Sequence, residues 1–160
     1  MEFISYIVCM VIVYQDFKDR TVHLFALIGL FLVNTISGYA LLEEGVFSLI
    51  GTNLLILIVL IGSLFLYYSA KHKKAHNILD KEFGKGDVLM LIALTPLFLS
   101  LSLLFFIIGI SFLGITIGIL FKIKTIPFAG ILAAGTLIYT LLIQLKVVEN
   151  YKPIQFFNWT

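Results

Sequence analysis

The longest uncharged run in the sequence limits the fold more than any other feature. Residues 88–121 are 34 consecutive residues without a charged side chain. As one α-helix this run would measure about 51 Å, whereas the hydrocarbon core of a bilayer is about 30 Å thick. Because Lys85 and Lys122 flank the run, the positive-inside rule requires an even number of crossings. The run therefore predicts two short spans joined by a turn near Ser100 to Ser102.

The rest of the chain has the same character and predicts an all-α, polytopic membrane protein with six transmembrane helices. Hydrophobic residues make up 61% of the sequence and charged residues 12%, far from the balance of a soluble domain. No internal repeat or low-complexity tract divides residues 1–160, which we interpret as one membrane-embedded domain. Pro96 falls inside a predicted span and could kink it, freeing backbone groups that a neighbour or water must satisfy. The spans are expected at about residues 2–20, 22–42, 46–69, 87–102, 103–121 and 125–145.

The basic residues predict the orientation of these spans. Nine of the 11 lysines and arginines lie in three clusters: Lys18 with Arg20, five lysines in residues 71–85, and Lys122 with Lys124. Six spans place all three clusters on one side of the bilayer, which the positive-inside rule makes the cytosolic side. We therefore expect a multi-pass protein of the plasma (inner) membrane. A net charge of +2 is too small to indicate a nucleic-acid partner.

Two aspartates lie at the cytosolic boundary of predicted spans. Asp16 is near the end of the first span and Asp87 begins the fourth, so the two are expected at the same depth. A charge in this setting is costly and usually functional. Two adjacent carboxylates cannot both ionise cheaply, so one keeps a proton while the other can activate water, as in aspartic proteases. Simpler interpretations of the single residues are an ion pair between Asp16 and Arg20 and a helix N-cap at Asp87.

A few other residues of the sequence are candidates for a functional role, and none of them predicts a metal site. Gly84 and Gly86, just before Asp87, would allow an extended substrate backbone or an unusual turn beside the carboxylate. The single Cys9 is interpreted as a small buried apolar residue. His72 and His76 are four residues apart but have no third ligand at a suitable spacing, so a solvated basic loop is the preferred interpretation.

Three segments in order along the chain resemble the prepilin peptidases, membrane aspartic proteases of the type IV leader peptidase family. Residues 16–22 (DFKDRTV) resemble the first motif of that family, in which a hydrophobic and a basic residue follow the aspartate and an arginine lies four positions on. Residues 83–88 (FGKGDV) resemble its Gly-x-Gly-Asp motif. Residues 126–130 (IPFAG) are similar to an Ile-Pro-Phe segment near the last span.

The resemblance implies an endopeptidase that removes the basic leader from type IV prepilin-like precursors (pilins or pseudopilins) at the cytosolic membrane face. Such enzymes serve type IV pilus assembly and protein secretion. The catalytic pair would be Asp16 and Asp87, and no metal or other cofactor is implied. Substrate binding or support of the motifs would fall to the neighbouring residues Gly84, Gly86, Lys18 and Arg20.

Departures from the family pattern limit what the resemblance carries over. His23 and Leu24 stand where many members have Pro-Asn, and Leu89 and Met90 where a lysine is common. The cysteine-containing insertion of larger, methylating members is also missing, so N-methyltransferase activity is not expected. Two other classes fit paired intramembrane carboxylates: a small proton-coupled transporter or channel, and a noncatalytic pilus-assembly membrane protein. A precursor cleavage assay separates the three.

Overall fold

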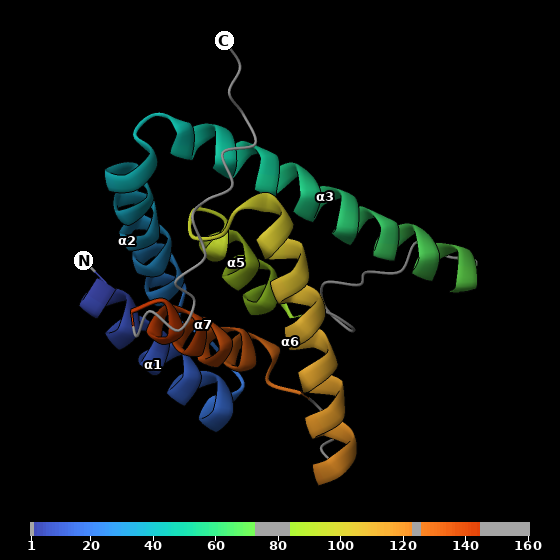
Figure 1. Cartoon of the computed structure of the whole chain (residues 1–160). Coiled ribbons are helices and arrows are strands. Elements are labelled where there is room, and N and C mark those ends of the chain that lie inside the picture. Colours follow the sequence, from blue (N-terminus) through green and yellow to red (C-terminus); the bar gives the residue numbers. More distant parts are fainter. Residues whose placement is uncertain (1, 73–83, 123–125, 145–160) are drawn as a thin grey trace.

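The computed structural model describes residues 2–72, 84–122 and 126–144, and within these ranges the regular structure is entirely α-helical (Figure 1). This confirms the all-α class. The helices of the described ranges are α1 (Glu2–Asp19), α2 (Leu24–Leu42), α3 (Gly45–His72), α5 (Lys85–Leu94), α6 (Ser100–Phe121) and α7 (Phe128–Gln144).

Three of these helices are long and apolar enough to cross a bilayer: α2, α3 over Gly45–Lys71, and α6 over Ser100–Leu120. α7 contains a shorter apolar stretch, Phe128–Leu142. The length and apolar composition of these helices indicate a membrane protein. The six crossings expected from the sequence stay a prediction.

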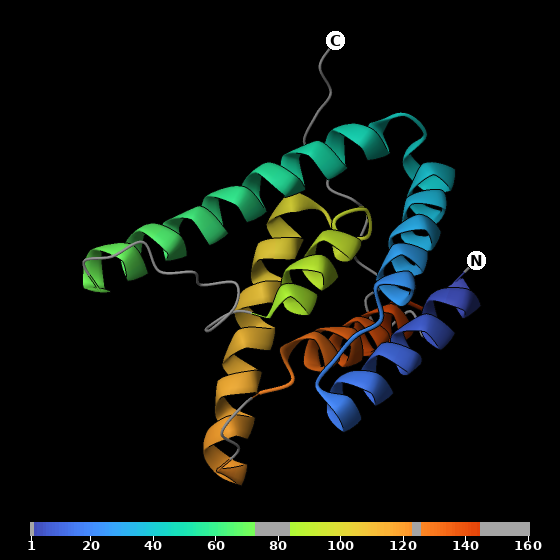
Figure 2. The same cartoon turned by 180° about the vertical axis from the view of Figure 1, so that it is seen from behind.

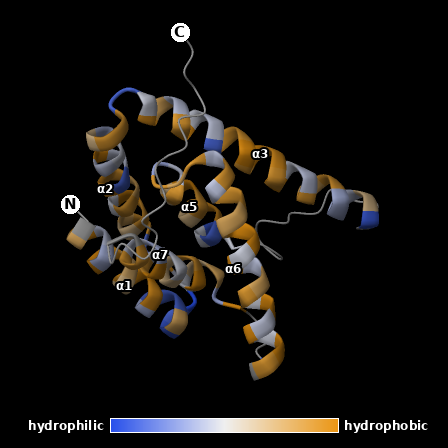
Figure 3. Cartoon of the chain, viewed as in Figure 1, coloured by the Kyte–Doolittle hydropathy of each residue, from blue (hydrophilic) through white to orange (hydrophobic). Residues whose placement is uncertain are grey.

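The surface of the long helices is apolar, whereas several polar side chains lie inside. Leu55 on α3 and Phe112 on α6 are 65% and 71% exposed, while Asn34 and Asn53 are 2% and 0% exposed. Figure 3 shows hydrophobic colouring over much of α3 and α6. In water this arrangement would be unfavourable, but in lipid the apolar surface is solvated and polar groups bond between helices.

α5 is shorter than the span expected at residues 87–102. It ends at Leu94, and α6 begins at Ser100, so the turn occupies residues 95–99 and not Ser100 to Ser102. Pro96 lies in this turn and ends the helix, where a kink within a longer helix was expected. The reason is that proline has no backbone N–H and its ring clashes with the preceding turn.

The carbonyl groups freed by this break are satisfied by side chains of two other helices. Asn53 of α3 donates from Nδ2 to the carbonyl oxygens of Thr95 and Phe98, both at 2.8 Å. Asn34 of α2 donates from Nδ2 to the carbonyl oxygen of Ala93 at 3.0 Å. Of the two donors expected from the sequence, a neighbour or water, neighbouring helices supply the ones seen at Ala93, Thr95 and Phe98, while the Ile92 carbonyl is bonded by Thr95.

Smaller differences occur at other helix ends. α1 ends at Asp19 because Arg20 adopts a left-handed φ of 55°, which delays α2 to Leu24 and not residue 22. α3 continues to His72, past the expected end at residue 69. α7 begins at Phe128, directly after Pro127, whereas the expected start at residue 125 and end at residue 145 lie outside the described residues.

The helices pack so that α7 contacts α1, α5 and α6, while α2 contacts α1 and α5. Figures 1 and 2 show α1 and α7 crossing on one side of the molecule and α3 extending away from them. Apolar side chains of the packed helices form the core, including Ile12, Leu30, Met90, Leu94 and Leu132. This packing brings the end of α1 and the first turns of α5 and α7 together.

Candidate functional site

Asp16 lies in the last turn of α1, on the face that packs into the bundle. Cys9, Ile12 and Asp16 follow the three- and four-residue spacing of one helix face, and they are 1%, 0% and 6% exposed. Cys9 is therefore buried, as expected. The Asp16 carboxylate is enclosed at the end of an otherwise apolar stripe.

Asp87 is the third residue of α5, after the N-cap Gly84. Its Oδ2 accepts a hydrogen bond from the Gly84 N–H at 3.2 Å. This is one half of a capping box, since glycine has no side chain to complete it. The N-cap interpretation of Asp87 is therefore wrong, because the N-cap residue is Gly84. One carboxylate oxygen of Asp87 nevertheless caps the start of the helix through the Gly84 N–H. The other oxygen is directed to α7.

The two carboxylates meet at the first turn of α7. The Asp87 Oδ1 accepts the Ala129 N–H at 2.8 Å, and the Asp16 Oδ2 accepts the Gly130 N–H at 2.5 Å. Consecutive residues advance a chain by at most about 3.8 Å, so these two oxygens lie within about 9 Å of each other. Two aspartates that are 71 positions apart in the sequence are thus brought to neighbouring amides.

The electrostatics of this end of α7 suit negative charge. The first N–H groups of a helix have no partner within it, and the aligned peptide dipoles place a partial positive charge there. Asp87 also lies in the first turn of its own helix, α5, where the peptide dipoles likewise place a partial positive charge. The charges of Asp16 and Asp87 repel each other. The amides of Ala129 and Gly130 therefore orient both carboxylates and offset part of this repulsion.

Two glycines have no room for a side chain because of these carboxylates. A Cβ at Gly130 would lie 3.0 Å from Asp16 Oδ2 and 2.9 Å from the Phe17 ring, and a Cβ at Gly84 would lie 2.9 Å from Asp87 Oδ2. A Cβ at Gly86 would meet Val22 at an ordinary 3.9 Å. The expected unusual turn is wrong, because Gly84 has φ −66° and ψ 138° and no described glycine has positive φ. Room for a substrate backbone stays a prediction.

The two basic residues of the first motif lie beside the site without touching the carboxylates. The Lys18 Nζ donates to the Tyr14 hydroxyl at 3.0 Å and lies 5.2 Å from the centre of that ring. Arg20 is exposed, and its backbone N–H donates to the Asp16 carbonyl oxygen at 3.2 Å. Both residues are described, and no ion pair joins Arg20 to Asp16. The surface ion pair considered from the sequence is therefore wrong.

Sequence reasoning missed the roles of Ala129 and Gly130, which act through backbone N–H groups. Residues 126–130 carried part of the family resemblance, but nothing in them indicated which side chains they would contact. A usable signal was present: Pro127 marks a helix start, where N–H groups are free, and Gly130 follows within the first turn.

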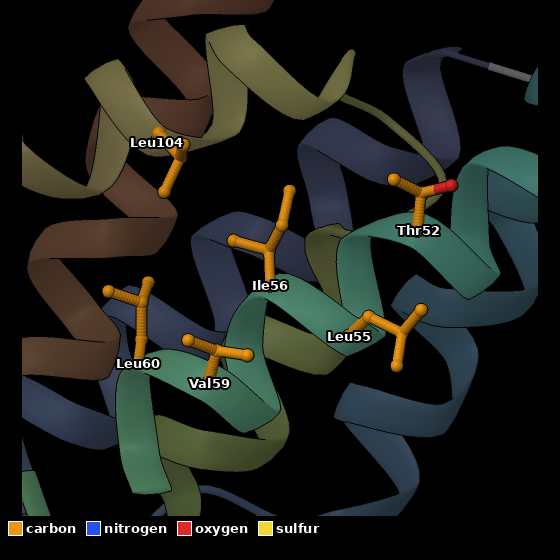
Figure 4. Close-up of a pocket in the computed structure, with 6 residues that line it drawn as sticks. All are labelled: Thr52, Leu55, Ile56, Val59, Leu60 and Leu104. Carbon is orange, nitrogen blue, oxygen red and sulfur yellow. The ribbon is translucent and has the colours of Figure 1, made fainter. Parts of the chain in front are cut away.

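Neither a metal-ligand cluster nor the cavity between α3 and α6 includes the two aspartates in the described part of the chain. Within the described ranges, no group of three or more His, Cys, Asp or Glu side chains could hold a metal ion. His76 lies outside those ranges. A cavity of about 380 Å³ opens between α3 and α6, and neither aspartate is among the residues that line it (Figure 4). It is lined by Thr52, Leu55, Ile56, Val59, Leu60 and Leu104.

No protein-family model, curated protein or solved structure matches the chain. The functional interpretation therefore depends on the three motifs and on the geometry of Asp16 and Asp87.

Proposed function

We propose that this chain is a membrane aspartic endopeptidase in which Asp16 and Asp87 form the catalytic pair. The observation that carries the proposal is that both carboxylates accept hydrogen bonds from consecutive amides, those of Ala129 and Gly130, at the start of α7. The three motifs that resemble the prepilin peptidases in sequence contribute Asp16, Asp87 and the amides of Ala129 and Gly130. Their meeting in space is what an enzyme of that kind requires.

The proposed reaction divides the work between a charged and a protonated carboxyl group. The ionised aspartate takes a proton from water, and the resulting hydroxyl oxygen bonds to the carbonyl carbon of the scissile peptide. The protonated partner gives its proton to the carbonyl oxygen, so that a neutral tetrahedral diol forms. Collapse of the diol breaks the C–N bond: the aspartate that took the proton from water gives it to the leaving nitrogen, and the other, now a carboxylate, takes a proton from a diol hydroxyl, which restores the starting pair. No cofactor takes part.

The amides of α7 supply orientation in this mechanism. Each holds one carboxylate oxygen, which restricts the orientation of the group and leaves Asp16 Oδ1 without a hydrogen bond to the described amides of α7. Fixed geometry matters because a misplacement of about 1 Å can cost about 100-fold in rate. Ala129 and Gly130 are therefore positioning residues, which act through the two aspartates.

The substrate proposed for this site is a prepilin-like precursor, whose basic leader would be cut at the cytosolic membrane face. Asp16 lies in the turn of α1 that ends beside Lys18 and Arg20, both exposed. Basic residues favour the cytosolic side, and the same reasoning puts the first turns of α5 and α7 there. A leader emerging from the bilayer into the cytosol would then reach the carboxylates from the side of these residues.

Leader cleavage by purified protein in liposomes tests the proposal. Asp16→Asn and Asp87→Asn should each lower the rate by about 100- to 10,000-fold, the usual contribution of a general acid or base. Asp19→Asn is the matched control, because Asp19 is an exposed aspartate at the end of the same helix. Full cleavage by either site variant would reject the catalytic pair. Proton flux without cleavage by the unaltered protein would support the transporter alternative.

A further inference from the structure

The two helices that carry the aspartates are held together by the same two neighbours. α1 and α5 each pack against α7, and each also packs against α2. At the α7 end, the amides of Ala129 and Gly130 hold the carboxylates themselves. The contact with α2 contains a polar bridge at the opposite end of both helices.

Asn34 of α2 forms this bridge. The Ser5 hydroxyl of α1 donates to the Asn34 Oδ1 at 3.3 Å, and the Asn34 Nδ2 donates to the Ala93 carbonyl oxygen of α5 at 3.0 Å. Asn34 is 2% exposed. One buried side chain thus bonds to both aspartate-bearing helices.

The acceptor on α5 is available because the helix ends early. In a continuous helix the Ala93 carbonyl would accept the Leu97 N–H, but that N–H donates to the Leu94 carbonyl instead, at 3.0 Å. A buried carbonyl without a partner is costly, so the Asn34 amide bonds to a group that needs a donor. The break at Pro96 and the polar residue on α2 therefore belong to one arrangement.

We infer that Asn34 is a positioning residue for the proposed peptidase: by bonding to Ser5 and Ala93 it fixes the axial register of α1 against α5. The inference rests on the proposed function. Ser5 lies about 16 Å along α1 from Asp16, and Ala93 about 9 Å along α5 from Asp87, at 1.5 Å per residue. A rigid helix held at one point can still tilt about that point, whereas a second point also fixes its direction. Asn34 supplies the second point for both helices.

Core packing alone gives no reason for an amide here. The neighbouring buried positions on the same face of α2 are Leu27 and Leu30, and a leucine would fill a similar volume without a polar group in an apolar interior. Asn53, the other buried asparagine within the described residues, bonds to Thr95 and Phe98 in the turn after α5 and has no hydrogen bond to α1. The bridge between the aspartate-bearing helices is therefore specific to Asn34.

Cleavage kinetics provide the first test. Asn34→Leu should lower kcat by about tenfold or more and change KM by less than about twofold, because the carboxylates are misplaced while the substrate contacts persist. Thr35→Val is the matched control, since the Thr35 hydroxyl bonds to Phe31 of its own helix at 2.8 Å, and it should cleave at the original rate. Ser5→Ala removes the α1 half of the bridge and should lower kcat in the same direction, which keeps the test decisive should Asn34→Leu not fold. Unchanged kcat in a folded Asn34→Leu or in Ser5→Ala would overturn the inference.

A distance measurement separates this inference from the proposed function. Nitroxide labels at Tyr14→Cys on α1 and Leu89→Cys on α5, in a Cys9→Ala background, occupy positions that are 62% and 37% exposed. Asn34→Leu should shift or broaden the label-to-label distance by about 1–2 Å, the scale of helix sliding, and Thr35→Val should not. An unchanged distance overturns the positioning role even where the protein cleaves precursors. A shifted distance in a protein that cleaves nothing supports the register role and rejects the peptidase.

Discussion

Gly130 donates its backbone N–H to the carboxylate of Asp16 at 2.5 Å across 114 positions of sequence. The same carboxylate oxygen lies 3.0 Å from the place a Cβ of residue 130 would occupy, and the Phe17 ring lies 2.9 Å from it. The amide can approach Asp16 this closely only because residue 130 has no side chain. The absence of a side chain at this position is thus part of the geometry of the candidate site.

Gly130→Ala should therefore lower precursor cleavage by about tenfold or more, since the Asp16 carboxylate must move by a few tenths of an ångström or more while the N–H is retained. Cleavage by purified protein, with membrane insertion checked in parallel, measures this. Gly51→Ala is the control, because nothing lies within 4 Å of a Cβ there, and alanine should stabilise helix α3 by about 0.5–1 kcal/mol. Equal rates for the Gly130→Ala protein and the unaltered chain would show that the Asp16 position does not limit catalysis.

The two glycines before Asp87 should respond differently to the same change. Gly84→Ala places a Cβ 2.9 Å from Asp87 Oδ2 and should reduce the cleavage rate about tenfold or more. Gly86→Ala makes an ordinary contact of 3.9 Å with Val22 and should reduce it much less. Side-by-side progress curves give the ratio. A loss at Gly86 as large as that at Gly84 would instead indicate that substrate backbone passes over residue 86.

Much of the helical layout and the pairing of the aspartates follows from the sequence, for a physical reason. Uncharged runs are expected to lie in lipid and basic clusters predict their orientation, so the sequence predicts one depth for Asp16 and Asp87 before any contact is known. The length of α5 did not follow. Proline can kink a membrane helix or end it, and at Pro96 the outcome depends on acceptors and donors from other helices.

The sequence also could not predict which side chains the backbone N–H groups contact. Ala129 and Gly130 act through amides that every residue but proline possesses, so no residue type marks them. Asn34 and Asn53 interrupt apolar runs, as do many polar residues that have no special role. Their acceptors on and after α5 could be identified only once it was known that this helix ends at Leu94.

Asn53→Leu should destabilise the folded protein by about 1–2 kcal/mol, because the carbonyl oxygens of Thr95 and Phe98 lose their donor inside a buried turn. Unfolding of the protein in mixed detergent micelles measures the difference. Thr52→Val on the preceding position is the control, since the Thr52 hydroxyl bonds to Ser48 within α3 and is exposed. Equal stability of the Asn53 and Thr52 variants would mean that the turn finds other donors.

Arg20 offers a test that separates backbone geometry from charge. Its φ of 55° is the left-handed conformation that ends α1, which costs a residue with a side chain about 1–2 kcal/mol relative to glycine. Its side chain is exposed and forms no ion pair with Asp16. Arg20→Gly should therefore be at least as stable as the unaltered protein and cleave within about threefold of its rate, since Lys18 remains as a basic residue in the last turn of α1.

Arg20→Ala is the matched variant for that test, because it removes the same charge but keeps the cost of the left-handed backbone. Thermal unfolding in detergent should place the glycine variant above the alanine variant by about 1 kcal/mol, while their cleavage rates agree with each other. If both variants lost cleavage by the same large factor, the guanidinium group itself would be needed. The exposed charge of Arg20 would then have a role in substrate recognition, in addition to the place of its backbone at the end of α1.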